Sequence, residues 1–276
     1  MKQLIFTKEG FEIPEETVTV IRKKEPYIIP AEKVIIGDTL CVRGLGTGFS
    51  ATGSYELGII AGWYAGDGTN ASGRPRLYFY GDKMSLVPEF LNAIKLLIGK
   101  EIPVCTATPG RKSVESKLLS AHLPLDKTAI PQQILKGSKD CQRGFISAIF
   151  SADGSIQGNI NKGLSVRLHS IDLEMLKNIQ RMLLNFSIFS KIYQNRMKEG
   201  FRSLPNGRGN LKEYWCKTSH ELCISKSSLI SFGSHIGFLQ EEKNTKLQNL
   251  LTSYKKGPYQ DRFTAKVIGI QLEKMR

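Results

Sequence analysis

The chain has 276 residues and a formal net charge of +14, with 39 lysine and arginine residues against 25 acidic ones. This length suffices for one large domain or two smaller ones, and the positive excess favours a polyanionic partner, although an acidic protein surface or an anionic membrane would satisfy charge alone. The five cysteines are widely spaced and include no Cys-x-x-Cys pair, which argues against a disulfide framework and against a zinc site.

Nothing in the sequence indicates export or membrane insertion. The N-terminus lacks the pattern of a signal peptide, and no apolar run is long enough to cross a bilayer. We therefore expect a cytoplasmic protein with no membrane partner.

Residues 57–68 read LGIIAGWYAGDG, an apolar run that predicts a buried helix. Ser54 can accept a hydrogen bond from the first turn, and Gly68 suits the left-handed conformation that often ends a helix. Three glycines recur at every fourth position and share one ridge: Gly58, Gly62 and Gly66. Because each glycine inside a helix is destabilising by roughly 0.5–1 kcal/mol, we expect a second backbone to approach this ridge closely.

After this helix the pattern changes to a period of two. From Arg74 to Tyr80, one face carries arginine and tyrosine while the other carries proline, leucine and phenylalanine, which predicts a strand with one basic face and one buried face. A helix is expected over residues 85–98, and a short basic turn follows at residues 109–112, Pro-Gly-Arg-Lys.

Residues 143–154, RGFISAIFSADG, repeat the first apolar segment in register. The same offset aligns Asp67 with Asp153 and Ser54 with Asp140, so we expect Asp140 to begin this helix and Gly154 to end it in the left-handed conformation. Small residues again form a ridge: Gly144, Ala148 and Ala152.

Two helices packed in parallel along these ridges would bring Asp67 and Asp153 together at one end. That position is electrostatically poor, because like charges approach each other at the negative ends of two helix dipoles. A divalent cation would relieve both penalties, and carboxylate oxygens suit Mg²⁺. A single Asp-Gly pair most simply closes a helix, but two copies in register favour a shared site.

The second half continues with the same order of elements. Residues 164–169 alternate between apolar and polar, which predicts a strand, and a helix is expected over residues 172–185. Basic residues then surround the turn-forming sequence Leu-Pro-Asn-Gly at residues 204–207, which predicts a long hairpin with a basic loop. A charged hairpin is often only a solvated surface, but two of them beside a duplicated acidic site favour a groove for a duplex.

Residues 60–68 and 146–154 both resemble the nine-residue LAGLIDADG motif. Over roughly residues 54–256 the chain is similar to monomeric, two-repeat LAGLIDADG homing endonucleases of the intein-encoded kind. The resemblance implies an α+β fold, with a pseudo-two-fold pair of αββαββα repeats, saddle-shaped antiparallel sheets that bind DNA, and short β-rich flanks.

The resemblance also implies an activity. The expected reaction is hydrolysis of one phosphodiester bond in each strand of a long, nearly non-palindromic double-stranded DNA target. Asp67 and Asp153 would bind the catalytic Mg²⁺, or another divalent cation such as Mn²⁺.

The family places a lysine near each metal site. Residues 127–131, Lys-Thr-Ala-Ile-Pro, resemble the element that carries it in the first half, which assigns this role to Lys127. Residues 236–238, Ile-Gly-Phe, followed by Lys243, resemble the matching element in the second half, where Lys246 is a close competitor.

Side chains on the polar faces of the predicted strands and in the basic hairpins are the candidate DNA contacts, because they can reach base edges or phosphates. In the first half they are Arg74, Arg76, Tyr78, Tyr80, Arg111 and Lys112. In the second half they are Arg167, His169, Lys191, Arg196, Arg202, Arg208 and Lys212.

The two flanks resemble parts of an intein splicing domain. Residues 33–40 resemble the strand-turn-strand just upstream of the endonuclease, and residues 266–270 resemble the strand that resumes downstream. We expect splicing-domain remnants at 1–48 and 257–276, or simply extra strands, around repeats at 49–138 and 139–256. Met1 replaces the Cys or Ser nucleophile and Arg276 replaces the terminal His-Asn pair, so we expect no protein splicing by this chain alone.

Two other functions stay open. Proteins of this fold include RNA maturases and transcription regulators that bind nucleic acid without cutting it, and the chain can also be a decayed intein fragment. The presence of both aspartates favours catalysis, since a binding protein does not need them.

Overall fold

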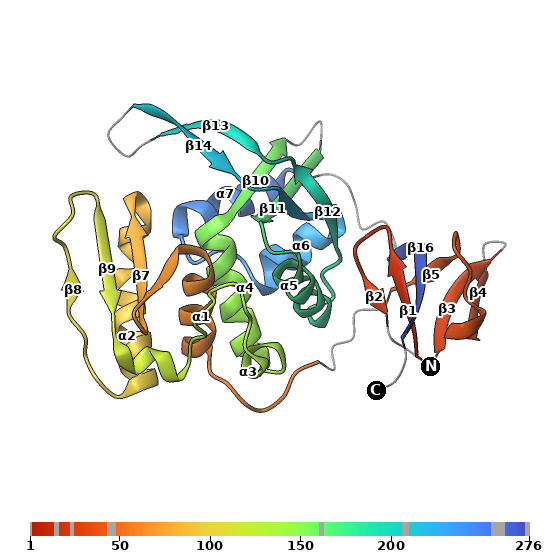
Figure 1. Ribbon diagram of the computed structural model, residues 1–276, viewed down its shortest axis with the longest axis horizontal. Helices are drawn as coiled ribbons and strands as arrows, with labels where there is room; N and C mark the ends of the chain where they lie inside the picture. The colour runs from red at the N-terminus through yellow and green to blue at the C-terminus, as the bar shows by residue number, and fades with distance from the viewer. Residues whose placement is uncertain are drawn as a thin grey trace.

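Two helices that lie side by side form the centre of the molecule (Figure 1). In the computed structural model, which describes residues 2–13, 17–22, 25–42, 48–159, 163–205, 210–254 and 263–273, they are α1 (Tyr55–Asp67) and α4 (Lys139–Asp153). Residues 57–66 of α1 are all buried, as are most residues of α4, which confirms the prediction from their apolar sequences.

The helices pack along their small-residue ridges, as predicted. A methyl group added at Gly58 would overlap the carbonyl oxygen of Cys141, and one added at Gly62 would overlap that of Phe145. Residue numbers increase together along both helices at these contacts, so the helices run in the same direction. The glycines therefore allow an approach between backbones that any side chain would prevent.

The predicted left-handed helix ends are wrong. Gly68 has φ −104° and ψ 165°, and Gly154 has φ −77° and ψ 156°. Both are extended because each helix runs directly into a strand. Glycine is still required, since a methyl group at either position would overlap the helix backbone at Tyr64 or Phe150.

The predicted N-cap is correct for α1 and wrong for α4. Ser54 Oγ accepts a hydrogen bond from the Leu57 N–H at 3.2 Å. In α4 the cap is Ser138, whose Oγ accepts from the Cys141 N–H at 3.1 Å. Asp140 lies one residue inside the helix, in its first turn.

Each central helix begins a repeat with the same order of elements. The first contains α1, β6 (Gly68–Ala71), β7 (Arg74–Tyr80), α2 (Val87–Ile98), β8 (Val104–Cys105), β9 (Arg111–Glu115) and α3 (Gln132–Leu135), with 3₁₀ turns at Gly81–Leu86 and Lys117–Ala121. The second contains α4, β10 (Gly154–Asn159), β11 (Gly163–Ser170), α5 (Leu173–Asn185), β12 (Ser190–Met197), β15 (Ser219–Ser225), α6 (Ser227–His235) and α7 (Glu241–Thr252).

The two repeats also share a sheet topology. Their antiparallel sheets have the orders β6-β7-β9-β8 and β10-β11-β15-β12. The strand predicted over residues 74–80 and the helix predicted over 172–185 are confirmed, while α2 starts two residues after the predicted Ser85, behind a 3₁₀ turn. The mixed α+β fold predicted for the chain is therefore confirmed.

A two-stranded ribbon is inserted between β12 and β15. It consists of β13 (Gly200–Pro205) and β14 (Leu211–Cys216) and projects from the body of the second repeat (Figure 1). The predicted hairpin is thus present, although residues 206–209 of its loop lie outside the described residues.

The two flanks form one six-stranded sheet of order β2-β1-β16-β5-β3-β4. Its strands are β1 (Lys2–Thr7), β2 (Glu12–Ile13), β3 (Thr17–Arg22), β4 (Glu25–Pro30), β5 (Thr39–Cys41) and β16 (Thr264–Glu273), with a 3₁₀ turn at Ala31–Lys33. The strand predicted at residues 266–270 is confirmed. In the 33–40 segment only the second strand forms, because the Asp38 carboxylate accepts from the Ile35 N–H at 3.0 Å and holds a turn.

Direct contacts attach this sheet to the second repeat. The Glu9 carbonyl accepts hydrogen bonds from Gln180 Nε2 at 2.9 Å and from the Ile192 N–H at 3.1 Å, and Lys177 pairs with Glu12. The flanking sheet therefore has a defined position beside α5 and β12.

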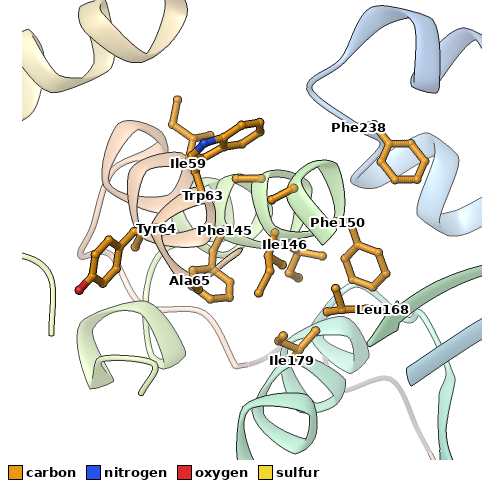
Figure 2. Close-up of a cluster of buried hydrophobic side chains, with 14 of the residues drawn as sticks. Ile59, Trp63, Tyr64, Ala65, Phe145, Ile146, Phe150, Leu168, Ile179 and Phe238 are labelled. Carbon is orange, nitrogen blue, oxygen red and sulfur yellow. The ribbon is translucent and has the colours of Figure 1, made fainter. Parts of the chain in front are cut away.

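The hydrophobic core surrounds the central helices. Figure 2 shows Phe150 of α4 gathered with Leu168 of β11 and Ile179 of α5. In the first repeat, Trp63 stacks on Phe79 and donates to the Tyr78 carbonyl at 2.9 Å, which ties α1 to β7. None of the described helices is both long enough and apolar enough to cross a membrane.

Candidate active site and nucleic-acid interface

The two repeated aspartates meet at one end of the central helix pair. Asp67 is the last residue of α1, and Asp153 is the last residue of α4. A methyl group built on Gly66 would lie 3.3 Å from Asp153 Oδ2, which places that carboxylate beside the end of α1. The parallel packing of the helices therefore brings both predicted acids to one place.

A lysine that sequence reasoning missed lies between the two helix ends. Lys83 Nζ donates to Asp67 Oδ2 at 2.5 Å and to the Ala152 carbonyl at 2.7 Å. It belongs to the turn after β7, and its ammonium lies 5.7 Å from the centre of the Trp63 ring. Oxygen atoms of both repeats thus converge on a cation. Among 39 lysines and arginines, no local pattern distinguishes Lys83.

Lys127 lies at the end of α1, as the resemblance implied. Its Nζ donates to the Gly66 carbonyl at 2.7 Å. The loop that carries it is held by the Tyr64 hydroxyl, which donates to the Pro124 carbonyl at 3.0 Å. The ammonium therefore offsets the negative end of the α1 dipole beside Asp67.

Lys243 lies at the equivalent end of α4. Its Nζ donates to the carbonyls of Phe150 at 3.1 Å, Ser151 at 3.3 Å and Gly154. Ser151 also positions the loop that precedes α7, because its Oγ accepts from the N–H of Leu239 in that loop at 2.7 Å. The competing candidate, Lys246, is exposed on α7, so the geometry favours Lys243.

The shared site changes the protonation of two groups. Surrounding protein atoms displace water from the Asp153 carboxyl group and raise its pKa, and the neighbouring Asp67 charge adds to this rise, although the residue keeps an exposed edge. Desolvation lowers the pKa of Lys243 to about 8, and the positive charge of Lys83 contributes. Both shifts have the direction expected where like charges are crowded together and protein atoms replace part of the surrounding water.

The donors at the helix ends suit a hard divalent cation. Within the described residues, no group of three or more His, Cys, Asp or Glu side chains forms a ready metal cage. The available donors are two carboxylates and neighbouring backbone carbonyls, which are the oxygen ligands that Mg²⁺ and Mn²⁺ accept. Because the Lys83 ammonium already bridges Asp67 and the Ala152 carbonyl, these oxygens accommodate a positive charge.

The first sheet presents a row of basic and aromatic side chains. Arg74, Arg76, Tyr78 and Tyr80 lie on one face of β7, opposite its buried residues. Arg111 joins this row, with its guanidinium 4.9 Å from the centre of the Tyr78 ring. Glu115, a residue not predicted, pairs with Arg76 across the strands.

Lys112 is separated from this row. It pairs with Phe79 in the ladder, and residues directly opposite each other share a face of the sheet. Lys112 therefore lies on the face that carries Phe79, opposite the face that carries Arg111, and its contact with DNA stays a prediction.

The second sheet has a comparable row organised by a buried acid. Arg167, His169 and Lys191 lie on the face that also carries Glu221, which is only 3% exposed. Glu221 contacts Arg167 at 3.2 Å, His169 at 3.0 Å and Arg196 at 3.8 Å. Sequence reasoning missed this acid, whose only local signal is a charged residue inside an alternating strand.

The remaining predicted contacts lie on the ribbon. Arg202 belongs to β13 and Lys212 to β14. Arg208 lies outside the described residues.

Comparison with known proteins gives one family match and several relatives. Residues 140–237 match the family model described as the LAGLIDADG-like domain. The chain is 28% identical to the ribonucleoside-diphosphate reductase NrdEB subunit alpha of Bacillus subtilis, and the match covers 96% of this chain and 27% of that protein. It is also 26% identical to the replication factor C small subunit of Methanocaldococcus jannaschii, and that match covers 89% of this chain and 12% of that protein. It thus spans about a quarter of its reductase relative.

One solved structure similar to this chain contains variants of the homing endonuclease I-DmoI. It has 17% sequence identity and a TM-score of 0.47, and the match covers 71% of this chain and 97% of that chain.

Proposed function

We propose that this chain, which carries a LAGLIDADG-like domain, is a site-specific DNA endonuclease of the homing type that depends on a divalent cation. The observation that carries the proposal is the meeting of Asp67 and Asp153 at the ends of two parallel, closely packed helices. A protein that only binds nucleic acid has no need to force two carboxylates together.

The side chains at the site have distinct roles in this proposal. Asp67 and Asp153 would hold a divalent cation, which supplies an activated water and stabilises charge on the leaving 3′ oxygen. Lys127 and Lys243 lie beside the carboxylates, where they would offset the negative charge that develops on the phosphate. With a pKa of about 8, the Lys243 amine can also accept and return a proton near neutral pH.

The polar faces of the two sheets would position a duplex over the site. The row headed by Arg76 and the row headed by Arg167 lie on separate repeats and flank the shared helix end. The unequal sequences of the repeats support a long, nearly non-palindromic target. A single chain with both repeats can act as a monomer.

We also propose an intein-derived origin. The chain matches a segment inside a reductase and a segment inside a replication factor, two proteins whose names denote unrelated activities. An inserted element explains this distribution better than a shared function. The flanks at 1–48 and 257–276 contribute to one sheet outside the repeats at 49–138 and 139–256, as remnants of a splicing domain would.

A cleavage assay tests the proposed activity. The substrate is supercoiled plasmid carrying the natural sequences that flank the inserted segment, joined without it. We expect a linear product in the presence of Mg²⁺ or Mn²⁺ and no product with EDTA. Binding of the joined duplex without cleavage at any divalent ion, or preferential binding of RNA, would instead support the non-cleaving function.

A further inference from the structure

The ribbon formed by β13 and β14 has two unlike faces. The ladder pairs Phe201 with Trp215, and these side chains share a face with Leu211. The opposite face carries Arg202, Tyr214 and Lys212. One face of the ribbon therefore carries mainly large apolar side chains, together with Ser203 and Glu213. The other face carries basic and aromatic side chains, together with Leu204.

The apolar face is open to solvent. The exposed fractions are 69% for Phe201, 58% for Trp215 and 69% for Leu211. The rings of Phe201 and Trp215 pack edge to face with centroids 5.1 Å apart, so they present one continuous surface. Exposed aromatic surface of this kind marks a contact with a partner.

The charge around the ribbon indicates what the partner is. Described residues of 190–217 include six basic side chains, at 191, 196, 198, 202, 212 and 217, and two acidic ones, Glu199 and Glu213. The ribbon continues from β12 and β15, which carry the basic row beside Glu221. A polyanion is therefore the partner that matches its charge, and the ribbon extends the surface proposed to bind DNA.

We propose that the apolar face of Phe201, Trp215 and Leu211 contacts a groove of duplex DNA beyond the cleavage site, while Arg202 and Lys212 reach phosphates. This inference rests on the proposed function. A two-stranded ribbon fits a groove of the duplex, and apolar side chains there contact base edges. Six residues per strand span roughly 20 Å, or about six base pairs.

Trp215 gives a direct test, because the other tryptophan of the chain, Trp63, is fully buried. Acrylamide quenching of the full chain is measured with a mixed-sequence duplex of about 40 base pairs at low salt, and Trp215→Phe supplies the background. Anisotropy of the labelled duplex reports binding in the same samples. We expect the bound duplex to reduce quenching of Trp215 at least twofold.

Salt dependence separates the two faces. We expect Phe201→Ala and Trp215→Ala to weaken duplex binding about tenfold without changing the slope of log affinity against log salt, because no counterions are involved. Arg202→Gln with Lys212→Gln should reduce that slope by about 1.8. Ile28→Ala, which removes an exposed apolar side chain of the flanking sheet, is the matched control and should change neither quantity.

The possible failures are distinguishable. A duplex that binds without protecting Trp215 overturns the ribbon contact and leaves the proposed endonuclease intact. Stronger protection of Trp215 by single-stranded DNA of the same length would indicate a single-stranded ligand. Protection that rises with protein concentration in the absence of DNA would indicate a second copy of the chain. Either result overturns the proposed contact with duplex DNA. Absence of any duplex binding by the unaltered chain overturns the proposed function as well.

Discussion

The two repeats hold their aspartates at equivalent backbone positions but neutralise them differently. Asp67 has a direct side-chain partner, since Lys83 binds its carboxylate and also reaches the Ala152 carbonyl. In the described part of the chain no hydrogen bond or ion pair reaches the Asp153 carboxylate, and its pKa is raised.

The lysines at the two helix ends also differ, and here the second repeat has the more extensive contacts. Lys127 binds one carbonyl of α1, whereas Lys243 binds three carbonyls at the end of α4. The duplication therefore preserved the position of the acids while each repeat acquired its own way to balance them. This difference predicts that equivalent changes in the two halves have unequal effects.

The largest expected effect is on cleavage. Asp67→Asn and Asp153→Asn should each reduce double-strand cleavage by at least about a thousandfold, because either change removes a charged oxygen donor from the shared site. Affinity for the duplex should stay within about twofold of the unaltered protein. Plasmid linearisation and duplex anisotropy measure the two quantities. Full activity in one variant would mean that only one repeat carries the catalytic acid.

The second-largest effect is expected on stability, after a substitution in the glycine ridge of α1. Gly62→Ala places a methyl group against the Phe145 carbonyl, so we expect the free energy of unfolding to fall by about 3 kcal/mol. Ala148→Gly on the facing helix removes a methyl group and should cost only about 1 kcal/mol. Urea denaturation compares the two, and equal losses would contradict the tight approach of α4 to the α1 glycines.

A pH dependence is expected from Lys243. Its pKa is about 8 in the folded protein, below the ordinary value of 10.5, so between these values the unfolded chain binds more protons. The free energy of unfolding should therefore rise with pH through this window, by about 2 kcal/mol after allowance for solvent screening. The measurement is urea denaturation at several pH values for the natural chain and for Lys243→Met. If both show the same rise, Lys243 is not its source.

Removal of Lys83 tests the difference between the two carboxylates. Lys83→Met leaves Asp67 without its partner at two negative helix ends, so we expect a loss of roughly 1–2 kcal/mol in stability without metal. Mg²⁺ should restore most of this loss, because it can replace the missing positive charge. Thermal unfolding with and without Mg²⁺ measures both effects, and unchanged stability in EDTA would show that the ammonium does not balance Asp67.

The smallest expected effect concerns the sheet surface. Arg76→Gln should weaken duplex binding about fivefold and reduce the salt slope by about 0.9 if the guanidinium contacts a phosphate. Lys100→Gln, at an exposed position after α2, is the matched control. Salt titrations of duplex affinity measure the slopes, and an unchanged slope for Arg76→Gln would argue against phosphate contact by the first sheet.

Local sequence patterns were sufficient for most of the fold. The repeated apolar runs with small residues at every fourth position predicted two buried helices that pack along their ridges, and alternation predicted β7 and β11. The patterns failed at helix boundaries. Asp140 and Ser138 are both good caps, and a glycine after a helix is compatible with either a left-handed end or a direct turn into a strand.

The sequence by itself determined that Asp67 and Asp153 occupy equivalent positions, because a duplication is visible in the order of residues alone. Only the tertiary structure decided which cations surround them. Lys83 and Glu221 reach their partners through contacts between segments distant in the chain, and no local periodicity records such contacts. The face on which Lys112 lies was likewise set by strand pairing, since the register between β7 and β9 is a property of two strands together.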